Sequence, residues 1–184
     1  MIFTETTLSG AYVITPTPIG DERGKFARVF CKNEFSKINH NKEFVQFNHS
    51  VNKIKGTVRG MHFQKHPFSE IKLIRCIKGS VYDVIVDLRP ESDTYLKWFG
   101  ETISAENMKM MYVPEGFAHG FQTLEEQSEL LYHHTNYYTP CSEGGINYAD
   151  KTINIKWLLP VTLVSDKDKT LPFINPTTNE LQIL

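Results

Sequence analysis

Residues 73–89 read LIRCIKGSVYDVIVDLR, two runs rich in apolar and β-branched residues with Lys78-Gly79 between them. Such runs, broken by a turn residue, are typical of neighbouring β-strands. Similar short runs continue on both sides of this pair. They predict strands at residues 44–51, 73–78, 81–88, 99–104, 109–113, 116–124, 129–137 and 153–157.

Short strands at regular spacing, with no helical pattern between them, indicate an all-β fold. The arrangement favours an antiparallel sandwich or barrel. One short helix is expected near residues 32–38, with Asn33 as its N-cap. The tail after Pro160 is expected to be mostly irregular. The chain of 184 residues has the length of one domain, residues 1–184.

Composition and charge argue against several classes of protein. The formal net charge of −1 gives no general electrostatic reason to expect nucleic acid or an anionic membrane as partner. Cys31, Cys76 and Cys141 are odd in number and form no CxxC pair, which favours a reducing compartment. No signal peptide and no apolar run long enough to cross a bilayer is present. We therefore expect a soluble, cytoplasmic protein.

Polar side chains recur at a period of two within the predicted strands. Two blocks, RGMHFQ at 59–64 and PEGFAHGF at 114–121, each place a histidine beside glycines. Residues two apart share a face of a strand. The sets that share a face are Gln46, Asn48 and Ser50; His62 and Gln64; Phe117, His119 and Phe121; and Leu130, Tyr132 and His134. Such faces either line a wet pocket or look outward at solvent, because buried polar groups must be satisfied.

The chain has seven histidines, and most of them must be ordinary. His66, His133 and His134 are interpreted as surface or packing residues. A metal site needs about three protein ligands, which His62, His119 and Asp83 could supply. However, no His-x-His pair occurs, and a lysine such as Lys72 suits a developing oxyanion better than a metal. We therefore expect no metal.

The ordered blocks 59–64, 79–89, 92–94, 114–121 and 131–144 are similar to the dTDP-4-dehydrorhamnose 3,5-epimerase family. The resemblance runs in order from Asp21 to Asp168, almost the whole chain. It implies a cupin-type β-jelly roll, a homodimer, and neither cofactor nor metal. The substrate it implies is a nucleotide-diphospho-4-keto-6-deoxyhexose.

The resemblance also implies roles for individual residues. A 4-keto group acidifies the protons on C3 and C5, and inversion of either carbon needs a base, a stabiliser of the enolate oxygen and an acid on the opposite face. His62 matches the base, Asp168 the carboxylate that orients it, Lys72 the cation near the keto oxygen, and Tyr132 the opposite proton donor. The expected substrate-binding residues are Arg23, Arg28, Gln46, Asn48, Arg59, His119, Tyr138, Glu143 and Lys167, with Tyr138 stacked on the nucleobase.

Arg28 departs from the family pattern, which carries a glutamate facing the thymine edge at this position. Glutamate accepts a hydrogen bond from thymine N3–H, whereas arginine only donates. Cytosine presents N3 and O2 as acceptors, so Arg28 favours a CDP-linked substrate over the dTDP-linked one that is the family's default. Phe47 likewise stands where family members often carry an acidic residue.

We predict an enzyme, an isomerase that inverts C3 of the sugar without a cofactor, and leave open whether C5 is inverted as well. Its product would feed deoxysugar synthesis for a surface polysaccharide of the lipopolysaccharide O-antigen type. A 3,4-ketoisomerase is one alternative, which shares the barrel but has no specific need of Tyr132. A nucleotide-sugar-binding cupin without activity is the other; it would keep Arg59 and Tyr138 while losing the base.

Overall fold

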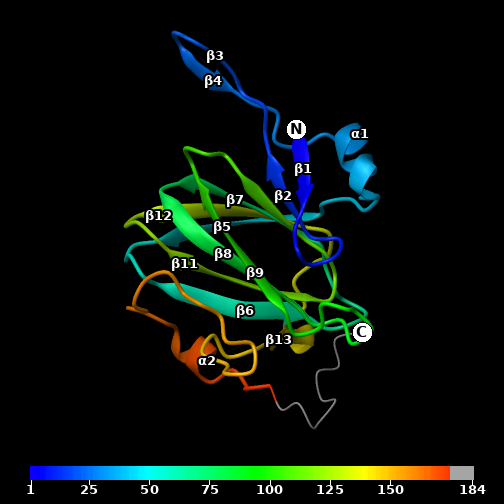
Figure 1. Cartoon of the computed structure of the whole chain (residues 1–184), viewed down its shortest axis with the longest axis vertical. Coiled ribbons are helices and arrows are strands. Elements are labelled where there is room, and N and C mark those ends of the chain that lie inside the picture. The colour runs from blue at the N-terminus through cyan, green and yellow to red at the C-terminus, as the bar shows by residue number, and fades with distance from the viewer. Residues whose placement is uncertain (175–184) are drawn as a thin grey trace.

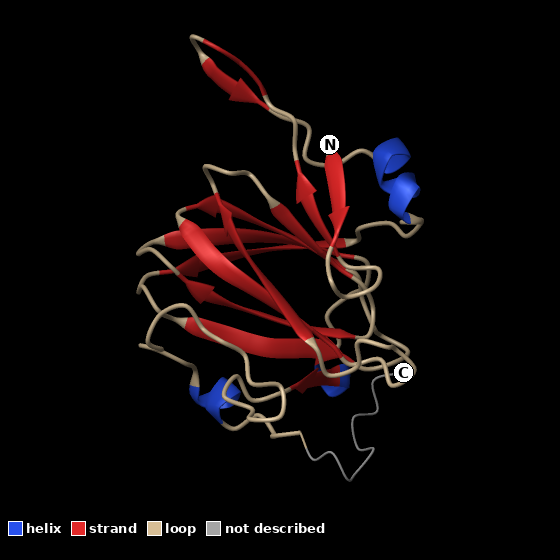
Figure 2. Cartoon of the chain, in the orientation of Figure 1, coloured by secondary structure: helices blue, strands red, loops and turns tan. Residues whose placement is uncertain are grey.

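The structure is a computed structural model that describes residues 1–174. Its regular secondary structure consists almost entirely of short strands, joined by loops (Figure 2). The strands are β1 Ile2–Glu5, β2 Tyr12–Thr15, β3 Ile19–Asp21, β4 Gly24–Phe26, β5 Gln46–Asn52, β6 Val58–Gln64, β7 Lys72–Lys78, β8 Ser80–Asp87, β9 Trp98–Ser104, β10 Met110–Val113, β11 Phe117–Thr123, β12 Ser128–His134 and β13 Glu143–Gly145.

Two antiparallel sheets face each other across the core (Figure 1). The first sheet has the order β1-β2-β10-β7-β12-β5, and the second has the order β13-β6-β11-β8-β9. The jumps between non-consecutive strands are those of a cupin-type jelly roll, so the predicted fold class is confirmed. The predicted strand at 153–157 is wrong. The Asp150 carboxylate accepts hydrogen bonds from the amides of Thr152 and Ile153, which turns the chain there, and Ile153 packs against the core.

Helical segments are few and short. They are α1 Lys32–Phe35, η1 Ser36–Ile38, η2 Pro140–Ser142 and α2 Asp166–Lys169. The helix predicted at 32–38 is present, but its N-cap is Cys31 in extended conformation and not Asn33, which lies inside the first turn. The helical segments described within residues 1–174 are all too short to span a lipid bilayer.

The inner faces of the two sheets combine apolar and polar side chains. Apolar side chains from both sheets form a fully buried cluster, including Ile74, Ile85, Met111 and Leu130. In the first sheet, β7 begins with the polar residue Lys72, which pairs with His134 at the end of β12. In the second sheet, His119 on β11 lies between two apolar residues of the cluster. One sandwich therefore holds a dry core and, beside it, a polar interior.

The strands β6 and β11 approach each other unusually closely. His119 pairs with His62, but Phe121 pairs with Arg59, so β6 carries one extra residue in this stretch. Gly60 lies in the resulting bulge with φ of +117°, and a Cβ atom there would lie 2.6 Å from Gly120 Cα. Because of the bulge, Arg59 and His62 project toward the same face although they are three residues apart.

The hairpin of β3 and β4 projects away from both sheets (Figure 1). Ile19 and Phe26 on this hairpin are 76% and 77% exposed. Large apolar side chains so far from a core are unusual on a protein that works as a monomer.

Gly60→Ala is expected to lower the free energy of unfolding by about 2–5 kcal/mol, because strained φ and a backbone clash add together. Gly10→Ala is the matched control: Gly10 has φ of +81°, but the added atom would meet only Pro114 Cγ at 3.7 Å, an ordinary contact. Its expected cost is about 1–2 kcal/mol, from strain alone. Urea denaturation of both variants measures the difference, and equal costs would contradict the close approach of the strands.

Candidate active site

A cavity of about 250 Å³ opens between the sheets beside the apolar cluster. Its lining comes from β5, β6, β7, β11 and β12, and consists of Asn48, Ser50, Arg59, His62, Lys72, His119, Phe121, Tyr132 and His134. The alternating polar faces of these strands thus turn inward to one cavity. His134, interpreted from the sequence as a surface or packing residue, is instead buried on the cavity wall.

His62 on β6 is held by Asp168 on α2. His62 Nε2 lies 2.8 Å from Asp168 Oδ1, while Asp168 Oδ2 accepts the amide N–H of Gly60 at 3.0 Å. Burial raises the pKa of Asp168, but the hydrogen bonds from His62 and Gly60 outweigh burial and lower it. An ionised Asp168 accepts Nε2–H, which leaves the lone pair of His62 on Nδ1. The His62 side chain is 32% exposed and lines the cavity, so this ring can exchange a proton with a ligand.

Lys72 on β7 supplies a buried positive charge to the cavity. Its Nζ lies 3.3 Å from the His62 carbonyl oxygen and 3.4 Å from Glu70 Oε1. Glu70 also accepts a hydrogen bond from His134. Sequence reasoning missed Glu70, although its spacing of two from Lys72 is the period that brings side chains of an extended segment to one side.

Tyr132 on β12 approaches the cavity from the sheet opposite His62. Its ring stacks on His134 with 6.0 Å between centroids, and it meets His119 edge-on at 5.9 Å. Burial and the negative charge of Asp83 raise the pKa of the Tyr132 phenol. The phenol therefore carries its proton at neutral pH and is suited to donating it.

His119 forms a second histidine–aspartate pair, with its Nε2 2.8 Å from Asp83 Oδ1. Both residues are buried. His62 and His119 are cross-strand neighbours, yet each is bound to its own aspartate. Among residues 1–174, no group of three or more His, Cys, Asp or Glu side chains is placed to hold a metal ion.

A polar cluster lies beside the cavity, around Tyr138. The Tyr138 hydroxyl donates to Glu143 Oε2 at 3.0 Å, and Lys167 Nζ donates to Glu143 Oε1 at 2.6 Å. Gln46 Oε1 accepts the Tyr138 amide at 3.0 Å. Burial raises the pKa of Glu143, but its two donors outweigh burial and lower it. Tyr138 presents an exposed aromatic ring next to charges that could bind a polar ligand.

Two of the predicted site residues are not brought to the cavity. Arg23 pairs with Asp21 on the projecting hairpin, and Arg28 Nη1 donates to Glu34 Oε1 at 3.0 Å. Both arginines are exposed, and neither lines the cavity. Within one chain, therefore, eleven of the thirteen predicted residues gather at or beside the cavity, which leaves these two apart from it.

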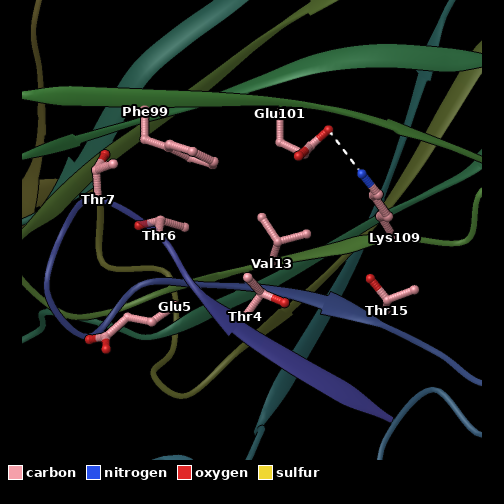
Figure 3. A pocket seen from close by; sticks show the side chains of 9 residues that line it. All are labelled: Thr4, Glu5, Thr6, Thr7, Val13, Thr15, Phe99, Glu101 and Lys109. Atoms are coloured by element: carbon pink, nitrogen blue, oxygen red, sulfur yellow. Dashed lines mark hydrogen bonds and ion pairs between the residues drawn. The ribbon is translucent and has the colours of Figure 1, made fainter.

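A second cavity, of about 340 Å³, lies between β1, β2 and β9 (Figure 3). Threonines and Phe99 make up most of its wall, and its ion pair joins Glu101 to Lys109 at 3.2 Å. Glu5, also on the wall, accepts a hydrogen bond from the amide of Gly10. No histidine or tyrosine lines this cavity. Glu101 and Lys109 are engaged with each other, and no histidine is present to exchange a proton near neutral pH, so the histidine-lined cavity is the better candidate for chemistry.

Solved structures with the same fold carry related ligands. The crystal structure of dTDP-4-dehydrorhamnose 3,5-epimerase from Bacillus anthracis, with TDP and PPi bound, superposes with a TM-score of 0.91 at 39% identity, covering 94% of this chain and 99% of that chain. The dTDP-6-deoxy-D-glucose-3,5-epimerase of Legionella pneumophila, in complex with dTDP-4-keto-L-rhamnose, gives 0.90 at 35% identity, covering 96% and 94%.

The sequence matches point to the same group of proteins. Residues 5–175 match the family model described as dTDP-4-dehydrorhamnose 3,5-epimerase. The enzyme of that name from Salmonella typhimurium is 43% identical over 177 residues, which are 95% of this chain and 96% of the relative. With a family model over most of its length and an isomerase at this identity, the chain is an isomerase acting on carbohydrates and belongs to the dTDP-4-dehydrorhamnose 3,5-epimerase family.

Proposed function

We propose that the protein inverts C3 and C5 of a nucleotide-linked 4-keto-6-deoxyhexose by proton abstraction and return, with no cofactor. The observation that carries this proposal is the convergence of His62, Lys72 and Tyr132 on one cavity from facing sheets. A base, a cation and a protonated phenol are the groups that inversion through an enolate requires. The names of the relatives support the same reaction.

In this mechanism His62 Nδ1 removes the proton next to the keto group. Asp168 accepts Nε2–H throughout and stabilises the imidazolium that forms. The electron pair of the broken C–H bond moves onto the keto oxygen, which the Lys72 ammonium stabilises. Tyr132 then gives its proton to the opposite face of the same carbon, and inversion is complete. The raised pKa of Tyr132 makes its phenolate a strong base that regains a proton readily.

The size of the cavity supports binding of the sugar inside it and of the nucleotide outside it. At about 250 Å³ it is smaller than the pockets of about 300–1,000 Å³ that enclose whole ligands. The sugar ring would occupy the cavity, with Arg59, His119 and Asn48 around it. The nucleotide would lie over the rim, with its base on Tyr138 and its phosphates near Arg59 and Lys167.

We propose further that the working form is a homodimer in which the β3–β4 hairpin completes the site of the partner subunit. Arg23 and Arg28 match substrate-contacting positions of the family, yet neither lines the cavity of its own chain. The exposed Ile19 and Phe26 supply apolar surface that a second copy would cover.

The product would serve deoxysugar synthesis for a surface polysaccharide of the lipopolysaccharide O-antigen type. We place the reaction in the cytoplasm, because Cys31, Cys76 and Cys141 are all free, as suits a reducing compartment.

Deuterium uptake from D2O into dTDP-4-keto-6-deoxyglucose tests the reaction. The wild type is expected to incorporate deuterium at C3 and C5, and deuterium at C3 alone would indicate single inversion.

His62→Ala is expected to abolish exchange. Tyr132→Phe is expected to slow inversion more than exchange, because His62 can return a proton to the face it came from. Equal loss of both in Tyr132→Phe would contradict the role of the phenol, and a product with its carbonyl moved to C3 would indicate a ketoisomerase.

The nucleobase is tested by comparing kcat/KM for dTDP-linked and CDP-linked substrates. Arg28 can only donate, which favours cytosine, and we propose that the CDP-linked sugar is used at least as well as the dTDP-linked one. Arg28→Glu is expected to shift the ratio toward thymine by about tenfold, the worth of one hydrogen bond to a charged group. A ratio strongly in favour of dTDP and unchanged in Arg28→Glu would contradict this role and indicate that the pair with Glu34 keeps Arg28 away from the base.

Whether the hairpin of one subunit serves the site of the other is tested with two variants, His62→Ala and Arg23→Ala. The two unfolded variants are mixed in equal amounts and refolded together. If the hairpin serves the partner, each mixed dimer contains one intact site. Half of randomly formed dimers are mixed, so about a quarter of wild-type activity is expected. Joint refolding of His62→Ala with Asp168→Ala is the control. Both residues belong to the cavity of the same chain, so every cavity in a mixed dimer lacks one of them and no intact site forms. Activity no higher than the sum of the separate variants would contradict a contribution of the hairpin to the site of the other subunit.

A further inference from the structure

Glu70 lies behind the cavity wall, between two residues that line it. Its Oε1 is 3.4 Å from Lys72 Nζ, and its Oε2 is 2.7 Å from His134 Nδ1. The side chains of Glu70, Lys72 and His134 are only 8%, 10% and 9% exposed. Both carboxylate oxygens are therefore engaged, each by one wall residue, in surroundings where an unpaired charge would be costly.

The partners of His134 fix which of its nitrogens carries the proton. Nε2 lies 3.3 Å from the amide nitrogen of Asn48, whose oxygen in turn faces the Gln46 amide at 3.4 Å. Asn48 Nδ2 is a donor, so His134 Nε2 accepts and Nδ1–H donates to Glu70. Hydrogen bonds therefore run from Gln46 through Asn48 and His134 to Glu70, and an ion pair joins Glu70 to the Lys72 ammonium.

The ionised form of Glu70 is the one that this chain of bonds requires. Burial raises the pKa of Glu70, but the hydrogen bond from His134 and the positive charge of Lys72 outweigh burial and lower it. The carboxylate can then accept from both neighbours at once. A neutral amide in the same place has one acceptor oxygen and would turn its NH2 group toward a donor.

The Lys72 ammonium has two protein partners. It donates a hydrogen bond to the His62 carbonyl oxygen and forms an ion pair with Glu70. The ammonium lines the cavity, so at least one of its three N–H bonds is left for a ligand. Without Glu70, the His62 carbonyl oxygen would be the only partner of the Lys72 ammonium among the contacts described above. The flexible lysine side chain could then adopt many rotamers.

We propose that Glu70 is a positioning residue: it holds the Lys72 ammonium at the place where the keto oxygen of the substrate becomes negative, and His134 fixes the carboxylate from its other oxygen. This inference rests on the proposed function, in which Lys72 stabilises the enolate. It adds a residue that touches no substrate and acts through the lysine.

Two effects of removing the carboxylate oppose each other. The ammonium would be less neutralised, which strengthens its attraction for an oxyanion. It would also lose its position, and a misplacement of about 1 Å costs on the order of 100-fold in rate. We expect loss of position to prevail, because a mobile ammonium in an open cavity is solvated by water.

The test compares Glu70→Gln and Glu70→Asp with Glu101→Gln. The last is the matched control, because it removes a carboxylate from a lysine at 3.2 Å in the cavity of Figure 3, away from the site. The first readout is a crystal structure of each variant, which reports the place of Lys72 Nζ without turnover. The second is kcat and KM for deuterium exchange. Matching far-UV circular dichroism and thermal melting establish that each variant is folded.

In Glu70→Gln, Nζ is expected to leave hydrogen-bond reach of the His62 carbonyl, and kcat is expected to fall about 100-fold. KM is expected to stay within about threefold, because contacts to the nucleotide are untouched. Glu70→Asp keeps the charge but withdraws it by one methylene, so an intermediate kcat is expected. Glu101→Gln is expected to match the wild type.

Three results would overturn the inference: Nζ in its wild-type place in Glu70→Gln, a kcat unchanged in that variant although Nζ has moved, or a kcat in Glu70→Asp equal to that of the wild type. Failure of the proposed function is recognised separately. In that case the wild type itself exchanges no deuterium, while the crystal structures still decide whether Glu70 places Lys72.

Discussion

The bulge in β6 is the constraint on which the candidate site depends. It turns Arg59 and His62 to one face of the strand, which a regular strand would not do for residues three apart. It also withdraws the amide of Gly60 from the sheet ladder. Asp168 accepts that amide with one oxygen and the His62 ring with the other. A single carboxylate therefore secures both the irregular backbone and the side chain that the irregularity exposes.

Near the β6 bulge, the space between the two sheets must provide both apolar packing and charged groups. A jelly roll is stabilised by apolar contact between its sheets, yet the proposed chemistry needs charged groups there. The protein meets both demands side by side, because Phe121 and Tyr132 contact the apolar cluster and also line the cavity. Three titratable groups of the cavity each have a carboxylate partner: His62 with Asp168, His119 with Asp83, and Lys72 with Glu70. Arg59 donates a hydrogen bond to Asn52. Pairing keeps a polar interior compatible with a folded core.

Much of this could be predicted from the sequence, because a strand has a period of two. The alternation brought Asn48 with Ser50 and Tyr132 with His134 to common faces, and resemblance to a family supplied Asp168, which is distant in sequence. The period could not predict that Arg59 joins His62, since a bulge leaves no mark on alternation. The strand predicted at 153–157 failed because the apolar run packs against the core without pairing. Arg23 and Arg28 match family positions, but a sequence does not say which subunit's cavity a projecting hairpin serves.

The hydrogen bond from the Gly60 amide to Asp168 allows the assembly of the site to be observed at a backbone amide. That amide proton is shielded from water only while the carboxylate keeps hold of it. Its rate of exchange with solvent, observed by nuclear magnetic resonance, would therefore report the free energy of separating α2 from β6. The fraction of molecules with an organised imidazole could thus be followed in the resting enzyme, with no sugar present.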